Sequence, residues 1–279
     1  MGQPRLDRPP WACPACVGSL IRSSDGSRRA GIHPTRNPMW SCTRCLRTFR
    51  TRAGFWDLVL ESEVGPKDRR FRRIYDHLNA LHDPACRIVL PVLQLQPESR
   101  SRTAYARFWH ALTRREARRV LEVGVGTGVN LSLLAGMSTP SPEVVGIDLS
   151  AGMLLRARGR VGGRSVVLVL ADAHRLPFST QAFDAILSVG GLNGFSDKRR
   201  ALVEMVRVLR PGGVALVVDE GLDKACSHPW FRMGFKVLTL GDRDARPPVD
   251  LLPAGVEDVH MEQVSRFYYA LSFRRSPGS

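Results

Sequence analysis

Four cysteines near the start of the chain have the residue type and spacing of a metal site. Cys13 and Cys16 form one Cys-x2-Cys pair, and Cys42 and Cys45 form a second pair after 25 intervening residues. Each pair places two thiolates on one tight turn, so two pairs supply the four tetrahedral ligands of structural zinc. Two disulfides are the alternative, which an intracellular chain disfavours, and a redox motif needs only one pair. We predict a structural zinc ion bound by these four residues.

A glycine-rich loop in the middle of the chain is a second candidate site. The β-branched segment 119–123 leads into Gly124, Gly126 and Gly128, and a helical pattern follows. Glycines at such a place let backbone N–H groups approach a ligand at the N-terminus of a helix. Val129 stands where the dinucleotide fingerprint needs glycine or alanine. The loop therefore predicts a bound ligand other than a dinucleotide.

Acidic residues end the next two predicted strands. The segment 143–148 ends in Asp148, twenty residues after Gly128. A carboxylate at that point can accept hydrogen bonds from both hydroxyls of a ribose, and it would repel a 2′-phosphate. The following apolar segment ends in Asp172 and Ala173.

A parallel α/β sheet is the element that must bring these residues together. From residue 119 onward, short apolar strands alternate with helical patterns, and a helix over 196–213 is expected to stop at Pro211-Gly212-Gly213. This order predicts a doubly wound sheet with its ligand beyond the carboxyl ends of the strands. Two β-rich segments, 256–264 and 266–273, are expected to close the sheet as antiparallel strands. Residues 221–254 form a long irregular insertion, either a substrate lid or a surface segment.

Five stretches resemble a known family. LEVGVGTG, GIDLSAGML, LADAHRLPF, FDAILSVGGLN and EMVRVLRPGGVALVVDE follow one another over 119–220. They resemble the class I S-adenosylmethionine-dependent methyltransferases, in the branch that includes the ubiquinone/menaquinone C-methyltransferases. The resemblance implies a Rossmann-like seven-stranded methyltransferase sheet and S-adenosylmethionine as the cofactor. The positions that match the cofactor-binding motifs are Glu122, Gly124, Gly126, Gly128, Asp148, Leu149, Met153, Asp172, Ala173, Val189 and Gly190.

The same resemblance implies a role for the matching residues nearest the methionine and ribose parts. Glu122, Gly124 and Gly126 would hold the methionine part of the cofactor, and Asp148 would bind the ribose.

For the rest of the cofactor, the resemblance implies that Met153 packs on the adenine and that Asp172 meets the adenine amino group. The backbone N–H of Ala173 would bind a ring nitrogen, and Val189 and Gly190 would line the methyl-donor end.

The front of the chain has a resemblance of its own. CPAC and CTRC followed by GFWDL are similar to the zinc ribbon of certain ribosomal RNA guanine-N1 methyltransferases and to a small zinc-ribbon activator of tRNA methyltransferases. The fourth ligand in the ribosomal RNA enzymes is typically histidine, where this chain has Cys45. Phe49, Phe55, Trp56 and Leu58 are expected to cover the small zinc module.

Three regions follow from these patterns. We expect a zinc ribbon at 11–58, a helical linker or cap at 66–118, and a methyltransferase domain at 119–279. The linker places Phe71, Ile74, Leu78 and Leu81 at helical spacing, and helical spacing returns over 103–118. These two amphipathic helices are expected to pack on the next domain, although their interleaved arginine and aromatic residues also suit RNA.

Charge and composition limit the class of protein. Hydrophobic residues make up 43% and charged residues 24% of the 279, which excludes a disordered, collagen-like or coiled-coil chain. No apolar run approaches the ~18 residues of a membrane span, and no secretory signal precedes the cysteines, so we expect a soluble, cytoplasmic protein. The net charge is +15, of which residues 1–119 carry +13 from 23 basic and 10 acidic residues. This asymmetry indicates either a surface for a polyanion or the arginine bias of a GC-rich genome.

The sequence predicts a methyltransferase acting on a small-molecule acceptor. The alternatives are methylation of a base in ribosomal or transfer RNA and a cofactor-binding homologue without catalysis. VGGLN replaces the Asn-Pro-Pro-Tyr type of motif used for the exocyclic amine of adenine, but this leaves a guanine ring nitrogen open. No catalytic residue is assigned; the candidates for a general base or its orienter are His174, Asn193, Asp219, Glu220 and His228.

Overall fold

The structure is a computed structural model. It describes residues 11–23, 39–94, 118–135, 142–162, 164, 166–226, 228–239 and 245–278. The second amphipathic helix expected at 103–118 lies outside this part except for its last residue.

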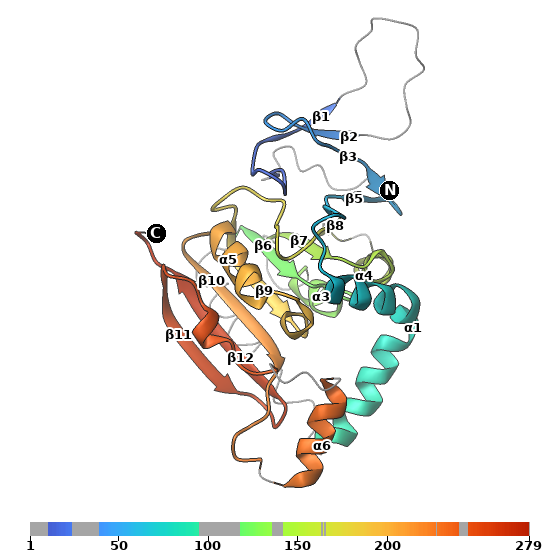
Figure 1. Cartoon of the computed structure of the whole chain (residues 1–279), viewed down its shortest axis with the longest axis vertical. Helices are drawn as coiled ribbons and strands as arrows, with labels where there is room; N and C mark the ends of the chain where they lie inside the picture. Colours follow the sequence, from blue (N-terminus) through green and yellow to red (C-terminus); the bar gives the residue numbers. More distant parts are fainter. Residues whose placement is uncertain are drawn as a thin grey trace, which may run out of the picture.

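A nine-stranded sheet forms the centre of the molecule, in the order β11-β12-β10-β9-β6-β7-β8-β5-β4 (Figure 1). The seven strands expected from the sequence are all present, and the five central ones are parallel. Their bounds are β6 (Arg119–Val123), β7 (Glu143–Asp148), β8 (Val166–Leu170), β9 (Phe183–Val189), β10 (Leu209–Glu220), β11 (Val256–Gln263) and β12 (Tyr268–Arg275). β12 pairs antiparallel with β10 and with β11. The Rossmann-like methyltransferase fold is thereby confirmed.

Two short strands from the front of the chain extend this sheet beyond the expected seven. β5 (Phe55–Asp57) pairs in parallel with β8, and β4 (Thr51–Arg52) pairs antiparallel with β5. Phe49, Trp56 and Leu58 share a hydrophobic cluster with Cys13 and Cys42, as expected. Phe55 is 1% exposed but packs in a separate cluster of the large sheet, so its predicted place over the cysteine module is wrong. The chain passes from the cysteines to the sheet without a free linker.

Helices cover both faces of the sheet. α3 (Val129–Leu134) and α4 (Ala151–Val161) follow β6 and β7, and α5 (Lys198–Val208) precedes β10. β8 reads Val-Val-Leu-Val-Leu and is buried throughout, as expected of a parallel strand covered on both faces. α4 is capped by Ser150, whose side chain accepts a hydrogen bond from Met153 N. The helix buries Met153, Leu154 and Ala157 at helical spacing.

α5 ends three residues before the predicted stop at Pro211-Gly212-Gly213. Leu209 already pairs with Phe183 as the first residue of β10. The guanidinium of Arg275, far along the chain, donates hydrogen bonds to the carbonyls of Val206, Arg207 and Leu209 at 3.2, 3.0 and 2.8 Å. These bonds satisfy carbonyl groups that a helix end leaves without partners, so a tertiary contact fixes the terminus.

α1 (Pro66–Gln94) forms the first part of the expected cap as one 29-residue helix. Phe71 and Ile74 are half-buried as the spacing predicted, whereas Leu78 is 50% exposed and lies outside the apolar contact. The side chain of Leu81 lies outside the described part of the chain. No helix within the described residues is long and apolar enough to cross a bilayer.

The insertion after β10 is more regular than expected, because it contains the helix α6 (Pro229–Leu238) and a 3₁₀ turn, η3 (Val249–Leu251). Figure 1 places α6 beside the second half of α1, at the end of the molecule opposite the small sheet of β1 (Leu20–Ser23), β2 (Met39–Cys42) and β3 (Thr48–Phe49).

Candidate functional site

The glycine loop after β6 adopts a conformation that glycine permits and other residues resist. Gly124, Gly126 and Gly128 all have positive φ, of 74°, 51° and 79°. A Cβ on Gly128 would lie 2.8 Å from the Cα of Ala157, so this glycine lets the loop pack against α4. A Cβ on Gly126 would meet nothing within 4 Å. The backbone at Gly126 is therefore open to a ligand at the carboxyl edge of the sheet.

Asp148, at the end of β7, faces this loop. Its Oδ2 accepts a hydrogen bond from Gly126 N at 2.9 Å, and its Oδ1 accepts one from Ser150 N at 2.8 Å. Burial raises the pKa of this carboxyl to about 6, against the two N–H donors, which lower it. Each oxygen keeps acceptor capacity for a further donor, because a carboxylate offers about four lone-pair sites. The sequence placed this residue beside the glycine loop, and the structure brings the two together.

Glu122 lies beneath the same loop and is fully buried. Asn130 Nδ2 donates to its Oε1 at 2.9 Å, whereas its Oε2 has no hydrogen-bond partner within the described residues. Burial raises the pKa of Glu122 to about 8. An unpaired buried carboxylate oxygen favours a cationic donor such as an ammonium group.

Asp172 and Ala173 follow β8 along the same edge. Both hydrogen bonds to Asp172 Oδ1 come from His174, from its backbone N at 2.9 Å and its Nδ1 at 2.6 Å. His174 Nε2 in turn accepts a hydrogen bond from Asp197 N at 3.2 Å, so both ring nitrogens of His174 are hydrogen-bonded within the protein. Ala173 N has no acceptor within the described residues and is available to a ligand. His174 therefore positions Asp172 and is a poor candidate for a general base.

The end of β9 completes the edge. Gly190 has a φ of 65°, is exposed, and has nothing within 4 Å of the place where a Cβ would stand. Gly190 N donates to Val218 O on β10 at 2.8 Å. Val189 precedes it and is half-buried, Met153 is 2% exposed on α4, and Leu149 is half-buried between β7 and α4.

Three of the candidate catalytic residues come together at this end. Asn193 Nδ2 donates to Asp219 Oδ1 at 3.0 Å and to Glu220 Oε2 at 3.1 Å. Asp219 is 0% exposed, and burial together with the neighbouring charge of Glu220 raises its pKa well above the usual range. Lys198 Nζ donates to Asn193 Oδ1 at 2.8 Å. The fifth candidate, His228, caps α6 by accepting from Trp230 N at 3.2 Å and stands apart from this group.

Three aspartates of α1, which the sequence analysis did not single out, fasten this helix across the carboxyl edge. Ser196 N donates to Asp68 at 3.0 Å, Gly152 N donates to Asp76 at 3.0 Å, and Thr127 Oγ1 donates to Asp83 at 2.6 Å. The three acids are separated by eight and seven residues, about two helical turns each, which places them on one face. This spacing is visible in the sequence and could have identified the three aspartates as one face of the helix.

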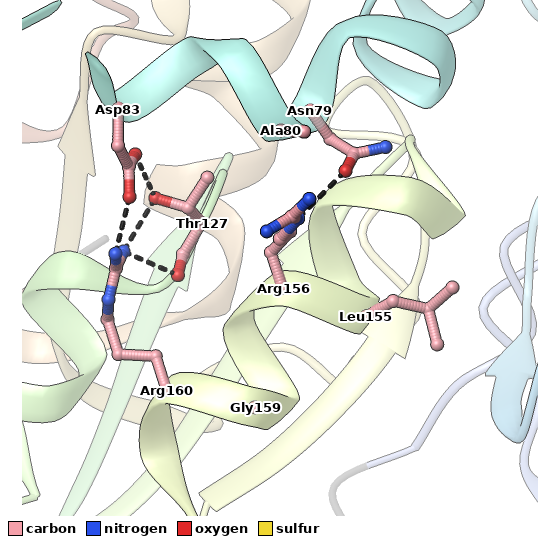
Figure 2. Close-up of a pocket in the computed structure, with 8 residues that line it drawn as sticks. All are labelled: Asn79, Ala80, Asp83, Thr127, Leu155, Arg156, Gly159 and Arg160. Atoms are coloured by element: carbon pink, nitrogen blue, oxygen red, sulfur yellow. Dashed lines mark hydrogen bonds and ion pairs between the residues drawn. The ribbon is translucent and has the colours of Figure 1, made fainter.

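A cavity of about 370 Å³ lies between α1 and α4 at the last of these contacts (Figure 2). Its charged groups are already paired, since Arg160 binds Asp83 and Thr127, and Arg156 Nε donates to Asn79 Oδ1 at 2.9 Å. The cavity therefore belongs to the contact between the two helices, and we assign no ligand to it.

The four cysteines converge at the front of the molecule. Their sulfur atoms all lie within 4.8 Å of one another, with 3.6 Å between Cys13 and Cys45 and 3.5 Å between Cys16 and Cys42. Four sulfurs bound to one zinc ion at ~2.3 Å lie roughly 3.8 Å apart, so the observed cluster has the dimensions of such a site.

Each cysteine pair forms the same backbone turn. Cys13 N donates to Gly18 O and Cys42 N donates to Arg47 O, both at 2.8 Å. Val17 and Leu46, each one residue after its pair, adopt positive φ of 59° and 60°. The two turns are thus equivalent halves of one cluster.

An aromatic series joins the cysteine module to the large domain. The Trp11 ring stacks on Phe178, with 5.3 Å between centroids, and Ala12 N donates to Pro177 O at 3.0 Å. Trp40 lies between Trp11 and Trp56, at 6.5 and 5.4 Å. The module and the large sheet therefore share one hydrophobic core.

Comparisons with known proteins agree with this geometry. Residues 121–217 match the family model of a methyltransferase domain. The ubiquinone/menaquinone biosynthesis C-methyltransferase UbiE of Burkholderia vietnamiensis is 33% identical over 194 residues, which cover 60% of this chain and 77% of that protein. The demethylmenaquinone methyltransferase of Thermus thermophilus is 40% identical over 104 residues, covering 37% of this chain and 47% of that protein. The chain spans 42% to 47% of the first relatives that it matches.

Solved structures share the fold at low identity. The crystal structure of the [4+2]-cyclase SpnF has a TM-score of 0.54 and 20% identity, covering 76% of this chain and 97% of that chain. A possible exported protein from Bordetella parapertussis has a TM-score of 0.51 and 21% identity, covering 63% and 68%. Because one of these proteins is a cyclase, the fold alone does not decide the reaction.

Proposed function

Since the chain belongs to the class I S-adenosylmethionine-dependent methyltransferases, we propose that it transfers a methyl group from S-adenosylmethionine to a small-molecule acceptor. The observation that carries the proposal is the pairing of Asp148 with Gly126 N at 2.9 Å, beside open space over Gly126. A ribose fits this corner because the carboxylate can accept its hydroxyls where no side chain intervenes.

The other groups on the edge suit the remaining parts of the cofactor. Glu122 Oε2, a buried acceptor without a partner in the described chain, suits the ammonium of the methionine part. Ala173 N suits a ring nitrogen of adenine, and Asp172, held by His174, suits the amino group beside it. Gly190 leaves open space at the methyl-donor end. Met153, Val189 and Leu149 supply the apolar walls.

S-adenosylmethionine supplies a methyl group on a sulfonium centre, which needs no protein nucleophile for an in-line displacement. The chain contributes position, and holding two reactants in line supplies much of the acceleration. α1, bound across the carboxyl edge at Asp68, Asp76 and Asp83, restricts the access of water to this edge.

Glu220 is our candidate for the group that removes a proton from the acceptor. Asp219 is fully buried, and both of its carboxylate oxygens already accept hydrogen bonds from Asn193, Oδ2 from the backbone N and Oδ1 from Nδ2, each at 3.0 Å. Asp219 is therefore a poorer candidate for the base than Glu220. Glu220 is half-buried and held by Asn193. A Glu220→Gln variant should bind S-adenosylmethionine normally but lose about 100-fold or more in turnover with an acceptor that must lose a proton. Unchanged turnover would remove Glu220 from this role.

Zinc in the cysteine cluster is the second part of the proposal. Four thiolates leave no open coordination position, so the ion would hold the two turns together and take no part in the reaction. Arg44 N and Cys45 N both donate to Cys42 Sγ at 3.4 Å, which stabilises a thiolate there.

RNA is the second candidate acceptor, favoured by the exposed Arg44, Arg47 and Arg50 of the cysteine module. Labelled S-adenosylmethionine, incubated with the protein and either total RNA or the RNA-free small molecules of one extract, separates the two. Label in the small-molecule fraction supports the proposal. Label at a single base position of RNA replaces it, and absence of both product and S-adenosylhomocysteine supports a cofactor-binding homologue without methyl transfer.

A further inference from the structure

The helix α6 presents an apolar face that nothing in the described chain covers. Trp230, Met233 and Val237 are 57%, 60% and 58% exposed. Their spacing of three and four residues places them on one side of the helix. We name these three side chains the outer face of α6. Large apolar side chains gathered on one exposed side indicate an interaction surface.

The opposite side of α6 is firmly packed. Phe235 is 8% exposed and lies against Phe267, with 5.7 Å between ring centroids. Phe231 contacts the same ring at 6.4 Å and carries the guanidinium of Arg266 at 4.3 Å above its centroid. These contacts fix the orientation of the helix, with Phe231 and Phe235 packed against Phe267 and the outer face turned away from that contact.

The charges around this face are basic. α6 contains Arg232 and Lys236, both exposed, and no acidic residue. At 100° per residue, Lys236 lies about 60° from Met233 and so borders the outer face, and Arg232 lies between Lys236 and Phe235. Residues 221–239 together hold three Lys or Arg and one Asp, within a chain of net charge +15. The partner must therefore offer both an apolar interior and negative charge.

We propose that the outer face of α6 docks on an anionic lipid bilayer. A helix that lies in the membrane interface has tryptophan and aliphatic side chains on one face and lysine or arginine beside it. A nucleic acid would satisfy the cations but would leave Met233 and Val237 in water. The proposed attachment is to the surface of the membrane.

The position of α6 gives this docking a consequence. The helix belongs to the insertion that follows Glu220, and it lies beside α1 at the end of the molecule away from the cysteine module (Figure 1). On a membrane, the carboxyl edge of the sheet would lie near the lipid and the cysteine module would face the solution. An apolar acceptor could then reach the site from the bilayer.

The test measures vesicle binding by the full chain without any cofactor, so it does not depend on the proposed methyl transfer. The wild type is sedimented with vesicles of phosphatidylcholine alone and of phosphatidylcholine mixed with phosphatidylglycerol. We expect binding to the mixed vesicles that persists in part at high salt. The variant Trp230→Ser/Met233→Ser/Val237→Ser should bind at least about tenfold more weakly, because its charge is unchanged while its apolar contact is lost.

A matched control removes three exposed apolar side chains elsewhere. Leu155, Val203 and Met261 are 43%, 42% and 50% exposed, and the triple change of these residues to Ser should leave binding unaltered. A second variant, Arg232→Glu/Lys236→Glu, keeps the outer face and should lose the preference for the mixed vesicles, so the proposal is tested even where the serine variant does not fold.

Three results would overturn the proposal. The first is a wild type that does not bind mixed vesicles. The second is a serine variant that binds as well as the wild type, which would assign the binding to the basic first half of the chain. The third is a dimer in solution that dissociates in the serine variant, which would assign the outer face to a second copy of the chain.

Discussion

The cysteine module and the carboxyl edge of the sheet are built in opposite ways. The module takes its four clustered cysteines from two local turns with the same backbone hydrogen bonds. The polar groups of the carboxyl edge come from the ends of β6, β7, β8, β9 and β10, and α1 is hydrogen-bonded across this edge. A site made of local turns can be recognised from spacing alone, whereas a site at a sheet edge can be recognised only after the strands and their parallel arrangement have been predicted.

The two regions are nevertheless one structure. β5 joins the large sheet, and Trp11 stacks on Phe178 within the same core. The described part of the cysteine module is therefore packed directly against the large sheet.

Loss of the metal is the largest effect that we expect. Protein purified without chelators should contain one zinc ion per chain, and Cys13→Ser/Cys42→Ser should contain none. Structural zinc contributes on the order of 10 kcal/mol to the folding of small modules, so the module should unfold in this variant. Cys226→Ser is the control, because Cys226 lies outside the cluster and should leave the metal content unchanged. Metal analysis decides the point, and wild-type protein without zinc would contradict it.

Trp11→Ala tests the connection between the regions. Trp11 is 7% exposed and stacks on Phe178, so its removal should lower the free energy of unfolding of the whole chain by about 3 kcal/mol. Trp230→Ala, at an exposed tryptophan, should change it by less than about 0.5 kcal/mol in the absence of membranes. Denaturant titration measures both. A separate transition of the module, with the large domain unaffected, would show that the connection is weak.

Asp148→Ala tests the sheet edge. S-adenosylmethionine should bind at least about 100-fold more weakly, a loss of about 2.7 kcal/mol, while the module keeps its metal. Asp184→Ala is a matched control, because this carboxylate also accepts two backbone N–H groups, from Arg118 and Arg119, but at the opposite edge of the sheet. Titration calorimetry gives the affinities. Equal losses in the two variants would mean that the loss reflects fold stability.

Glu122 gives the smallest and most specific effect, a dependence of affinity on pH. Its pKa is raised from 4.5 to about 8, and a bound ammonium group favours the ionised carboxylate, so cofactor binding releases a proton below about pH 8. The affinity should therefore rise between about pH 6.5 and 8, by at most about tenfold per pH unit, and level off above that range. In Glu122→Gln this dependence should disappear.

The stability of the free protein should change with pH in the opposite direction. Above pH 4.5 the unfolded chain loses the Glu122 proton, whereas the folded chain retains it up to about pH 8. The folded state then binds more protons, so this group makes the fold less stable as the pH rises through that window. The Gln variant should show a flatter stability profile. A steeper profile in the variant would contradict the burial of an unpaired acid at this site.

Much of the fold could be predicted because its signals are local. The all-apolar run of β8, the glycines after β6 and the spacing of the cysteines each impose a shape within a few residues. The carboxyl ends of parallel strands meet at one edge, which is why Asp148 could be placed beside Gly126 before any contact was known. The resemblance supplied the roles of these residues, which spacing does not give.

The remaining features depend on segments far apart in the sequence. The end of α5 is fixed by Arg275, some 67 residues beyond Val208, and Phe55 is buried because β5 finds β8. The regularity of α6 was missed because its apolar residues occur on more than one side, so they show no single buried stripe. Leu78 has the spacing of a buried residue but is exposed, because the cap meets the domain through its aspartates.

The sequence by itself determined the two cysteine pairs, the succession of strands along the chain and the acids at the strand ends, since residue type and period fix these within single elements. Only the tertiary structure decided that the cysteine module shares the core of the large sheet, that α1 fastens over the edge, and that the outer face of α6 stays exposed. Each of these depends on which surfaces meet. That choice is made by the packing of whole elements, and no local pattern carries it.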